Sequence, residues 1–163
     1  MTTRQLRVLF LSRRNTVRSL MAEAILNHAG APRFIGLSAG IEAAAEADPL
    51  TLAALQKARY PTRGLRPKVV TDPSIGAEPL DFVFTLSDTA RGETLPEWPG
   101  HPISAHWACD DPVLIEDDEI GRALIFGRVL AGLERRIKIF IELPFESLDR
   151  QSLQHHVDQI SGH

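Results

Sequence analysis

The chain alternates apolar, β-rich runs with segments of helical pattern, and this alternation limits its possible folds more than any other feature. The runs are RVLFL (7–11), RFIGLSAG (33–40), DFVFTL (81–86) and PISAHW (102–107). Strands separated by helices indicate βαβ units, in which the crossover helices lie on the faces of a parallel sheet. The sequence therefore predicts an α/β protein with a parallel sheet covered on both faces.

Two helices are expected between the first strands. The first begins near Arg18 and ends at Gly30, after a broad apolar face. The second covers PLTLAALQKARY (49–60), with Asp48 as its N-cap and a proline in its first position. The segment 61–80 is rich in proline and glycine, so we expect it to be mostly loop.

The second half of the chain predicts one long helix, from Glu119 to Leu143, and a short amphipathic helix over 148–160. The apolar residues expected on one side of the long helix are Ile120, Leu124, Ile125, Val129, Leu133, Ile137 and Phe140. The acidic run EDDE (116–119) precedes this helix. Carboxylates are favourable at a helix N-terminus, so a capping role is expected there instead of a metal site.

Length and composition fit one compact domain. The chain has 163 residues, of which 44% are apolar, and a formal net charge of −3. We expect a single domain over 1–163, in which 144–163 forms a C-terminal helical tail. No apolar run approaches a membrane span and the N-terminus is unlike a secretory signal, which predicts a soluble, cytoplasmic protein without a membrane partner. The near-neutral charge argues against nucleic-acid binding.

Cys109 is the one cysteine of the chain, so an internal disulfide and a cysteine-rich metal site are both excluded. An ordinary packed side chain is the expected role of Cys109. The histidines show no metal-ligand spacing with carboxylate support. We therefore expect no metal and no cofactor.

The stretch SRRNTVRS (12–19) follows the first strand and opens the first helix. Between a parallel strand and a helix, backbone N–H groups converge and the helix dipole adds positive charge, which favours an anion. Arg18 would clamp two oxygens of a tetrahedral anion. The alternative is that Arg13, Arg14 and Arg18 are solvated loop cations.

This loop resembles the phosphate loop of the low-molecular-weight protein tyrosine phosphatases and of the thioredoxin-coupled arsenate reductases. The family loop consists of Cys, five residues, Arg and then Ser or Thr, and is followed by a helix like LMAEAIL (20–26). LSAGIE (37–42) and HWACDDPV (106–113) resemble two further family motifs. The resemblance covers Leu6 to about Leu143, and implies a three-layer α/β/α fold with a four-stranded parallel sheet in the order 2-1-3-4.

The chain departs from the family where the thiols should be. Ser12 occupies the position of the nucleophilic cysteine, Val17 that of the usual second loop cysteine, and Ser87 that of a further reductase cysteine. A thiol is easily ionised by a helix N-terminus and arginines, whereas a serine hydroxyl needs an adjacent base, and the loop contains no His or Lys. The expected protein is therefore a catalytically inactive or impaired homologue.

The loop is still expected to bind phosphate, sulfate or arsenate, or a phosphorylated ligand. The candidate oxyanion-binding residues are Ser12, Arg13, Arg14, Asn15, Thr16, Val17, Arg18 and Ser19. Arg14 replaces the usual loop glycine, so its side chain either fills the pocket or helps to line it. Asn15 suits a left-handed, bracing position. Asp111 resembles the family's general acid, with a turn-capping role as the alternative.

Two other functions stay open at this point. In the first, the loop is purely structural, and the chain is an interaction or regulatory module whose tail (144–163) docks a protein partner or forms a homodimer. In the second, Ser12 is an engineered replacement that makes a substrate trap of an active phosphatase. A pocket filled by Arg14 would favour the interaction module, and an open pocket lined by Arg18 would favour oxyanion binding.

Overall fold

The computed structural model describes residues 4–162, which contain one sheet of four parallel strands. The strands are β1 (Leu6–Ser12), β2 (Phe34–Gly40), β3 (Phe82–Thr85) and β4 (Ile103–His106). Their spatial order is β2-β1-β3-β4, the order that the resemblance implied. Strand β1 is central and pairs with β2 over its whole length, which places Ser12 beside Gly40 at the carboxyl end of the sheet.

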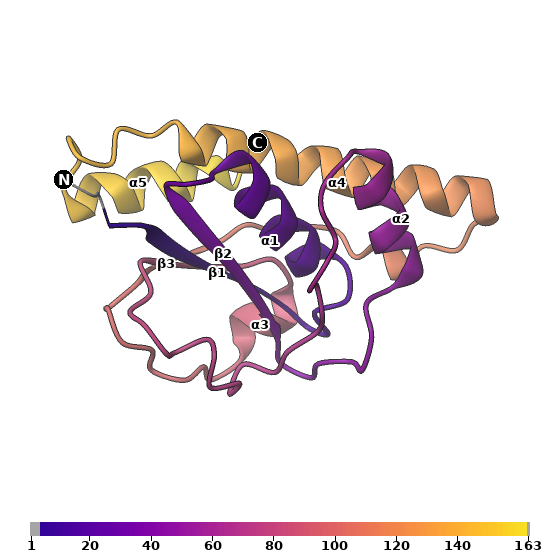
Figure 1. Cartoon of the computed structure of the whole chain (residues 1–163), viewed down its shortest axis with the longest axis horizontal. Helices are drawn as coiled ribbons and strands as arrows, with labels where there is room; N and C mark the ends of the chain where they lie inside the picture. Colours follow the sequence, from indigo (N-terminus) through magenta and orange to yellow (C-terminus); the bar gives the residue numbers. More distant parts are fainter. Residues whose placement is uncertain (1–3, 163) are drawn as a thin grey trace.

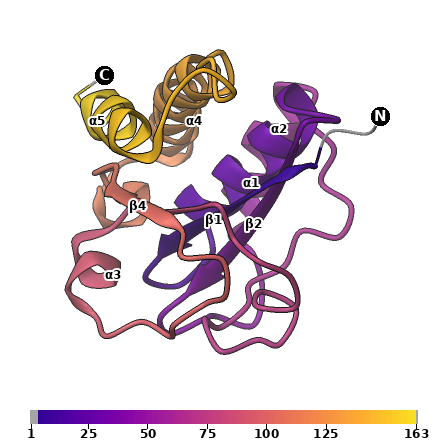
Figure 2. The same ribbon diagram turned by 90° about the vertical axis from the view of Figure 1, so that its left-hand side faces the viewer.

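Helices cover the two faces of the sheet unequally. They are α1 (Arg18–Ala29), α2 (Pro49–Lys57), α3 (Asp88–Gly92), α4 (Glu119–Ile141) and α5 (Arg150–Ile160). Four of them, α1, α2, α4 and α5, lie on one side, and α3 lies on the other together with long loops (Figures 1 and 2). The predicted three-layer architecture is therefore present, with one thick helical layer and one thin layer.

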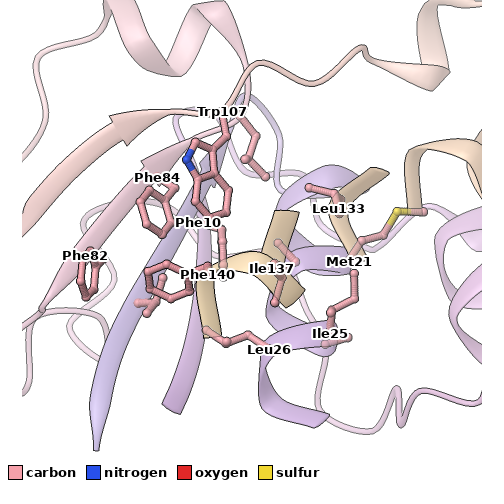
Figure 3. Packing of buried hydrophobic residues seen from close by; sticks show 14 of the residues in the cluster. Phe10, Met21, Ile25, Leu26, Phe82, Phe84, Trp107, Leu133, Ile137 and Phe140 are labelled. Atoms are coloured by element: carbon pink, nitrogen blue, oxygen red, sulfur yellow. The ribbon is translucent and has the colours of Figure 1, made fainter. Parts of the chain in front are cut away.

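Alternation along β1 divides the core between these layers. Val8 and Phe10 belong to the larger buried cluster under the four helices, whereas Leu9 and Leu11 belong to a smaller cluster on the opposite face. Figure 3 shows the aromatic centre of the larger cluster, formed by Phe10, Phe82, Phe84, Trp107 and Phe140. Strand β1 is thus buried on both faces, and the loop that follows it has a rigid base.

The predicted caps of two helices are present, and one short helix was missed. The carboxylate of Asp48 accepts a hydrogen bond from the amide N–H of Leu50 at the start of α2 (2.9 Å), and Asp118 caps α4. Helix α2 ends three residues before the predicted end, and α5 begins two residues after the predicted start. The five-residue helix α3 was not predicted, because it is too short for a periodic apolar pattern.

The prediction for the apolar side of α4 was partly wrong. The buried residues of this helix are Phe126, Leu130, Leu133, Ile137 and Phe140. Ile120 and Leu124 are 75% and 59% exposed, because both lie far around the helix from the buried side that Phe126 marks. Among the described residues, no helix is long and apolar enough to cross a membrane.

Candidate functional site

The loop between Ser12 and Arg18 lies at the carboxyl edge of the sheet, between the last residue of β1 and the first residue of α1. Its carbonyl oxygens accept hydrogen bonds from the segment that follows β2. The donors are the amides of Ile41 to Ser12 (3.3 Å), Glu42 to Arg13 (2.9 Å), Ala44 to Arg14 (3.1 Å) and Asp48 to Thr16 (3.2 Å). The segment after β2 therefore fixes the direction of these peptide planes.

Because these carbonyl groups point toward the segment after β2, the amide N–H groups of the loop point toward its inside. In a trans peptide, the N–H points away from the C=O of the preceding residue. Within the part of the chain that the structure describes, the amides of residues 13–17 donate no hydrogen bond to a backbone carbonyl. The loop therefore presents unpaired N–H donors beside the N-terminus of α1, which is the arrangement that binds anions.

Gly40 allows the loop to lie this close to β2. A Cβ atom at this position would lie 2.9 Å from the carbonyl carbon of Arg14 and 3.0 Å from the carbonyl oxygen of Arg13. Both atoms belong to the backbone, so a larger residue at position 40 would displace the loop. The glycine of the LSAGIE stretch thus has a steric role at the site.

Three buried polar side chains brace the inside of the loop. The hydroxyl oxygens of Ser12 and Ser19 lie 2.6 Å apart, and the Asn15 amide donates to the Ser19 hydroxyl at 2.7 Å. Asn15 has a φ of 57°, the left-handed conformation that the sequence suggested. The amide N–H of Lys68 donates to Oδ1 of Asn15 (2.9 Å). Both the nitrogen and the oxygen of the Asn15 side-chain amide are therefore hydrogen-bonded.

Lys68 was missed by the sequence analysis. Its ammonium group lies 3.5 Å from Oε1 of Glu23, and the Ser38 hydroxyl donates to the same oxygen at 2.7 Å. The side chains of Lys68 and Glu23 are only 9% and 13% exposed. The ammonium also donates to the carbonyl oxygen of Arg66. The one sign of this ion pair in the sequence was Glu23, a charged residue within the apolar helix LMAEAIL.

Arg18 crosses from α1 to the loop that follows β4. Its side chain is 9% exposed, with Nη1 donating to the carbonyl oxygen of Cys109 (3.0 Å) and Nη2 lying 3.4 Å from Oδ2 of Asp111. The other carboxylate oxygen of Asp111 accepts from the amide of Val113. Asp111 therefore borders the site and also caps the short 3-10 turn η1 (Pro112–Leu114), which is the alternative role that the sequence suggested.

A cavity of about 290 Å³ opens in front of Arg18. Its walls include Arg13, Arg18, Ser87, Cys109 and Asp111. Arg14 is exposed and is not part of these walls. Its side chain thus neither fills nor lines this cavity, whose walls include Arg13 and Arg18 but none of the loop residues 14–17.

Two more of the predicted loop residues contribute to the site through their backbone. Val17 is 3% exposed and its side chain belongs to the hydrophobic core. The carbonyl oxygen of Thr16 accepts hydrogen bonds from the Asp48 amide and from the Thr51 hydroxyl (2.8 Å). Of Val17, the amide N–H and not the side chain is therefore directed toward the inside of the loop.

Cys109 lies on the wall of this cavity and is half-buried. Burial raises the pKa of its thiol, although the charges of Arg18 and Arg136 act in the opposite direction. Arg18 contacts the carbonyl oxygen of Cys109 and not its sulfur. At neutral pH this residue is therefore a protonated, weakly nucleophilic thiol.

Ser87 and His106 have structural partners at the end of the sheet. The Ser87 hydroxyl accepts from the amide of Ala90 and caps α3. His106 lies between the Thr85 hydroxyl (2.7 Å from Nδ1) and the Asp88 carboxylate (3.1 Å from Nε2). Among residues 4–162, no group of three or more His, Cys, Asp or Glu side chains could hold a metal ion.

Comparison with known proteins places this chain in a family. Residues 7–155 match the family model of the low molecular weight phosphotyrosine protein phosphatases. An arsenate reductase of Shouchella clausii is 32% identical over 138 residues, which are 83% of this chain and 94% of the relative.

Solved structures share the fold. A thioredoxin-dependent arsenate reductase of Corynebacterium glutamicum is 27% identical, with a TM-score of 0.63 over 87% of this chain and 64% of that one. This chain thus spans slightly less than two thirds of that reductase. The tyrosine phosphatase Wzb of Escherichia coli K30, solved in complex with sulphate, is 18% identical, with a TM-score of 0.66 over 85% of this chain and 98% of that one. The chain belongs to the low molecular weight phosphotyrosine protein phosphatase family.

Proposed function

We propose that this protein binds a tetrahedral oxyanion, such as phosphate or arsenate, in the loop 12–19 and does not perform cysteine-dependent catalysis. The observation that carries the proposal is Ser12. Its hydroxyl lies at the head of a loop whose amide groups are turned inward, in the position that the family resemblance assigns to the nucleophilic thiol. The site keeps the parts that hold an anion and lacks the part that attacks it.

The surroundings of Ser12 do not activate its hydroxyl. Its hydrogen-bond partner is the hydroxyl of Ser19, which is not a base at neutral pH. A serine nucleophile needs an adjacent general base to take its proton. The loop residues 12–19 supply none, so Ser12 is expected to bind an anion without forming a phosphoserine.

Reduction of arsenate needs two electrons, which paired thiols supply when they close a disulfide. This chain has one cysteine, and burial raises the pKa of its thiol. Cys109 therefore cannot close an intramolecular disulfide. The reductase activity of the relatives does not transfer to this chain.

The position of Arg14 argues against a purely structural loop. Its side chain is exposed and leaves the cavity in front of Arg18 open. A single engineered replacement is also a poor account, because Arg14, Val17 and Ser87 depart from the family as well as Ser12. Natural divergence to an oxyanion-binding protein of the cytoplasm, with one domain over 1–163, explains all four positions.

Calorimetric titration with phosphate and with arsenate tests the binding half of the proposal. Assays of p-nitrophenyl phosphate hydrolysis and of thioredoxin-coupled arsenate reduction test the other half. We expect saturable binding of both anions and no turnover above the buffer rate. Robust turnover, or the absence of anion binding, would overturn the proposal.

A further inference from the structure

Exposed apolar side chains are concentrated in one short segment of this protein. Among the described residues, six large hydrophobic side chains are exposed, and five of them lie between positions 113 and 124. These five are Val113, Leu114, Ile115, Ile120 and Leu124. We call them the 113–124 surface. Scattered exposed apolar residues are normal, but a cluster of this kind marks an interaction site.

The helical part of this surface is not a displaced piece of the core. Successive residues of an α-helix are rotated by roughly 100°, which places Ile120 about 120° and Leu124 about 160° away from the buried Phe126. A small rotation of α4 would therefore not bury them together with the core residues. These side chains form a second apolar face, which residues 4–162 leave uncovered.

Two residues beside this face are small and uncharged. Ala123 and Gly127 are exposed on the same side of α4, and a Cβ atom at Gly127 would meet nothing within 4 Å. Packing inside the molecule therefore does not require this glycine, although glycine lowers the stability of an exposed helix. Large and small apolar residues side by side give an uneven surface into which the side chains of a partner can pack.

Carboxylates predominate in the segment that leads into α4, and Arg122 and Arg128 follow within the helix. Residues 109–121 contain six carboxylates and no lysine or arginine. Four of these carboxylates, at positions 116–119, are exposed between the two apolar parts of the surface. Complementary charge at the rim of an interface speeds association and selects the partner. An occupant of this surface must therefore combine apolar side chains with positive charge.

We propose that the 113–124 surface docks a protein partner through an apolar segment flanked by lysine or arginine side chains. This surface borders the oxyanion site, because Leu114 lies on the wall of the cavity in front of Arg18. The proposal does not depend on oxyanion binding. It requires only the exposed apolar face and the acidic rim.

Three synthetic 18-residue helical peptides test the proposal by anisotropy titration against the full chain. The first has a leucine face flanked by lysines, the second has glutamates in place of these lysines, and the third has serines in place of the leucines. We expect saturable binding of the first peptide and at least tenfold weaker binding of the other two. Equal binding of the glutamate or the serine peptide would overturn the proposal.

Protein variants locate the binding. Ile120→Ser/Leu124→Ser should weaken binding of the first peptide at least tenfold. Val69→Ser, which alters the sixth exposed apolar residue, should leave the affinity within twofold. Equal loss in both variants, or in neither, would contradict docking at this surface.

Two further measurements distinguish partner docking from damage to the oxyanion site and from self-association. Phosphate titration of Ile120→Ser/Leu124→Ser should give the wild-type affinity, so a failure of peptide docking is distinct from a failure of oxyanion binding. Sedimentation velocity should show a monomeric wild type. A wild-type dimer that becomes monomeric in the double variant would make a second copy the occupant and overturn the proposal.

Discussion

Arg18 is the residue on which oxyanion binding should depend most. Its planar guanidinium can hold two oxygens of a tetrahedral anion, whereas the ammonium of lysine acts as a point charge. We expect Arg18→Lys to weaken phosphate binding at least tenfold, which corresponds to about 1.4 kcal/mol or more. Calorimetric titration measures this change.

Arg13→Lys is the matched control for this prediction. The side chain of Arg13 is 56% exposed and lies 3.8 Å from the carboxylate of Glu42. Its contribution is screened by solvent, so the affinity should change by less than threefold. An unchanged affinity in the Arg18 variant would mean that general positive charge, which lysine keeps, and not the geometry of Arg18, holds the anion.

Cys109 should show a shifted alkylation profile. Because burial raises its pKa, the thiolate fraction at pH 8 is smaller than in the unfolded chain. The rate of reaction with iodoacetamide should therefore rise with a midpoint at higher pH in the folded protein than in urea. Steric shielding lowers the rate at every pH and does not move this midpoint. A midpoint below that of the unfolded chain would contradict the shift.

At the residue scale, the sequence predicted local geometry better than distant partners. The left-handed conformation of Asn15 follows from its residue type and its place in a turn. The bond from the Lys68 amide to Asn15 spans 53 positions and uses the backbone, so residue identity carries no signal of it. The outward direction of Arg14 likewise depends on peptide planes that Ala44 and its neighbours fix.

Helix α2 is an element whose start is coupled to the oxyanion loop. Asp48 caps α2 through its carboxylate, and its amide donates to the carbonyl oxygen of Thr16. Asp48→Ala should lower the free energy of unfolding by about 1 kcal/mol in urea denaturation. Asp48→Asn, which keeps a capping oxygen, should retain most of that stability. Equal destabilisation by both substitutions would indicate that the negative charge, not the cap, is responsible.

The segment 66–70 braces the loop through a buried ion pair. Lys68→Met would leave the Glu23 carboxylate with the Ser38 hydroxyl as its remaining partner. Removing one member of a buried pair costs about 3–5 kcal/mol, because the other charge stays buried. Chemical denaturation should show a loss of this size. The double variant Lys68→Met/Glu23→Gln removes both charges and should recover part of it; no recovery would mean that lost packing causes the effect.

At the element scale, periodicity predicted which helices exist but not which parts of them are covered. The pattern of α4 gave its bounds to within two residues, since apolar residues recur along its whole length. It could not show which apolar side of α4 packs against the core and leaves Ile120 and Leu124 exposed, because the position of neighbouring elements is a tertiary property. The strand order came from the family resemblance, since β3 pairs with β1 across a long intervening segment.

For the whole molecule, oxyanion binding implies a stability that depends on phosphate. A ligand that binds only the folded state stabilises it by RT ln(1 + [L]/Kd), which is about 2.7 kcal/mol at one hundred times Kd. For a chain of this length, each kcal/mol raises Tm by about 2–4 °C, so wild-type protein should gain about 5–11 °C.

Arg18→Lys distinguishes site binding from a general salt effect on this stability. With a tenfold weaker Kd, the variant should gain about half as much at the same phosphate concentration. Differential scanning calorimetry in phosphate, against sodium chloride of equal ionic strength, measures both gains. An identical rise in the two proteins would mean that phosphate acts by exclusion from the whole surface, as kosmotropic salts do, and not through the loop. A larger rise of Tm in the wild type would mean that phosphate stabilises the entire fold by binding to the inward amides and Arg18.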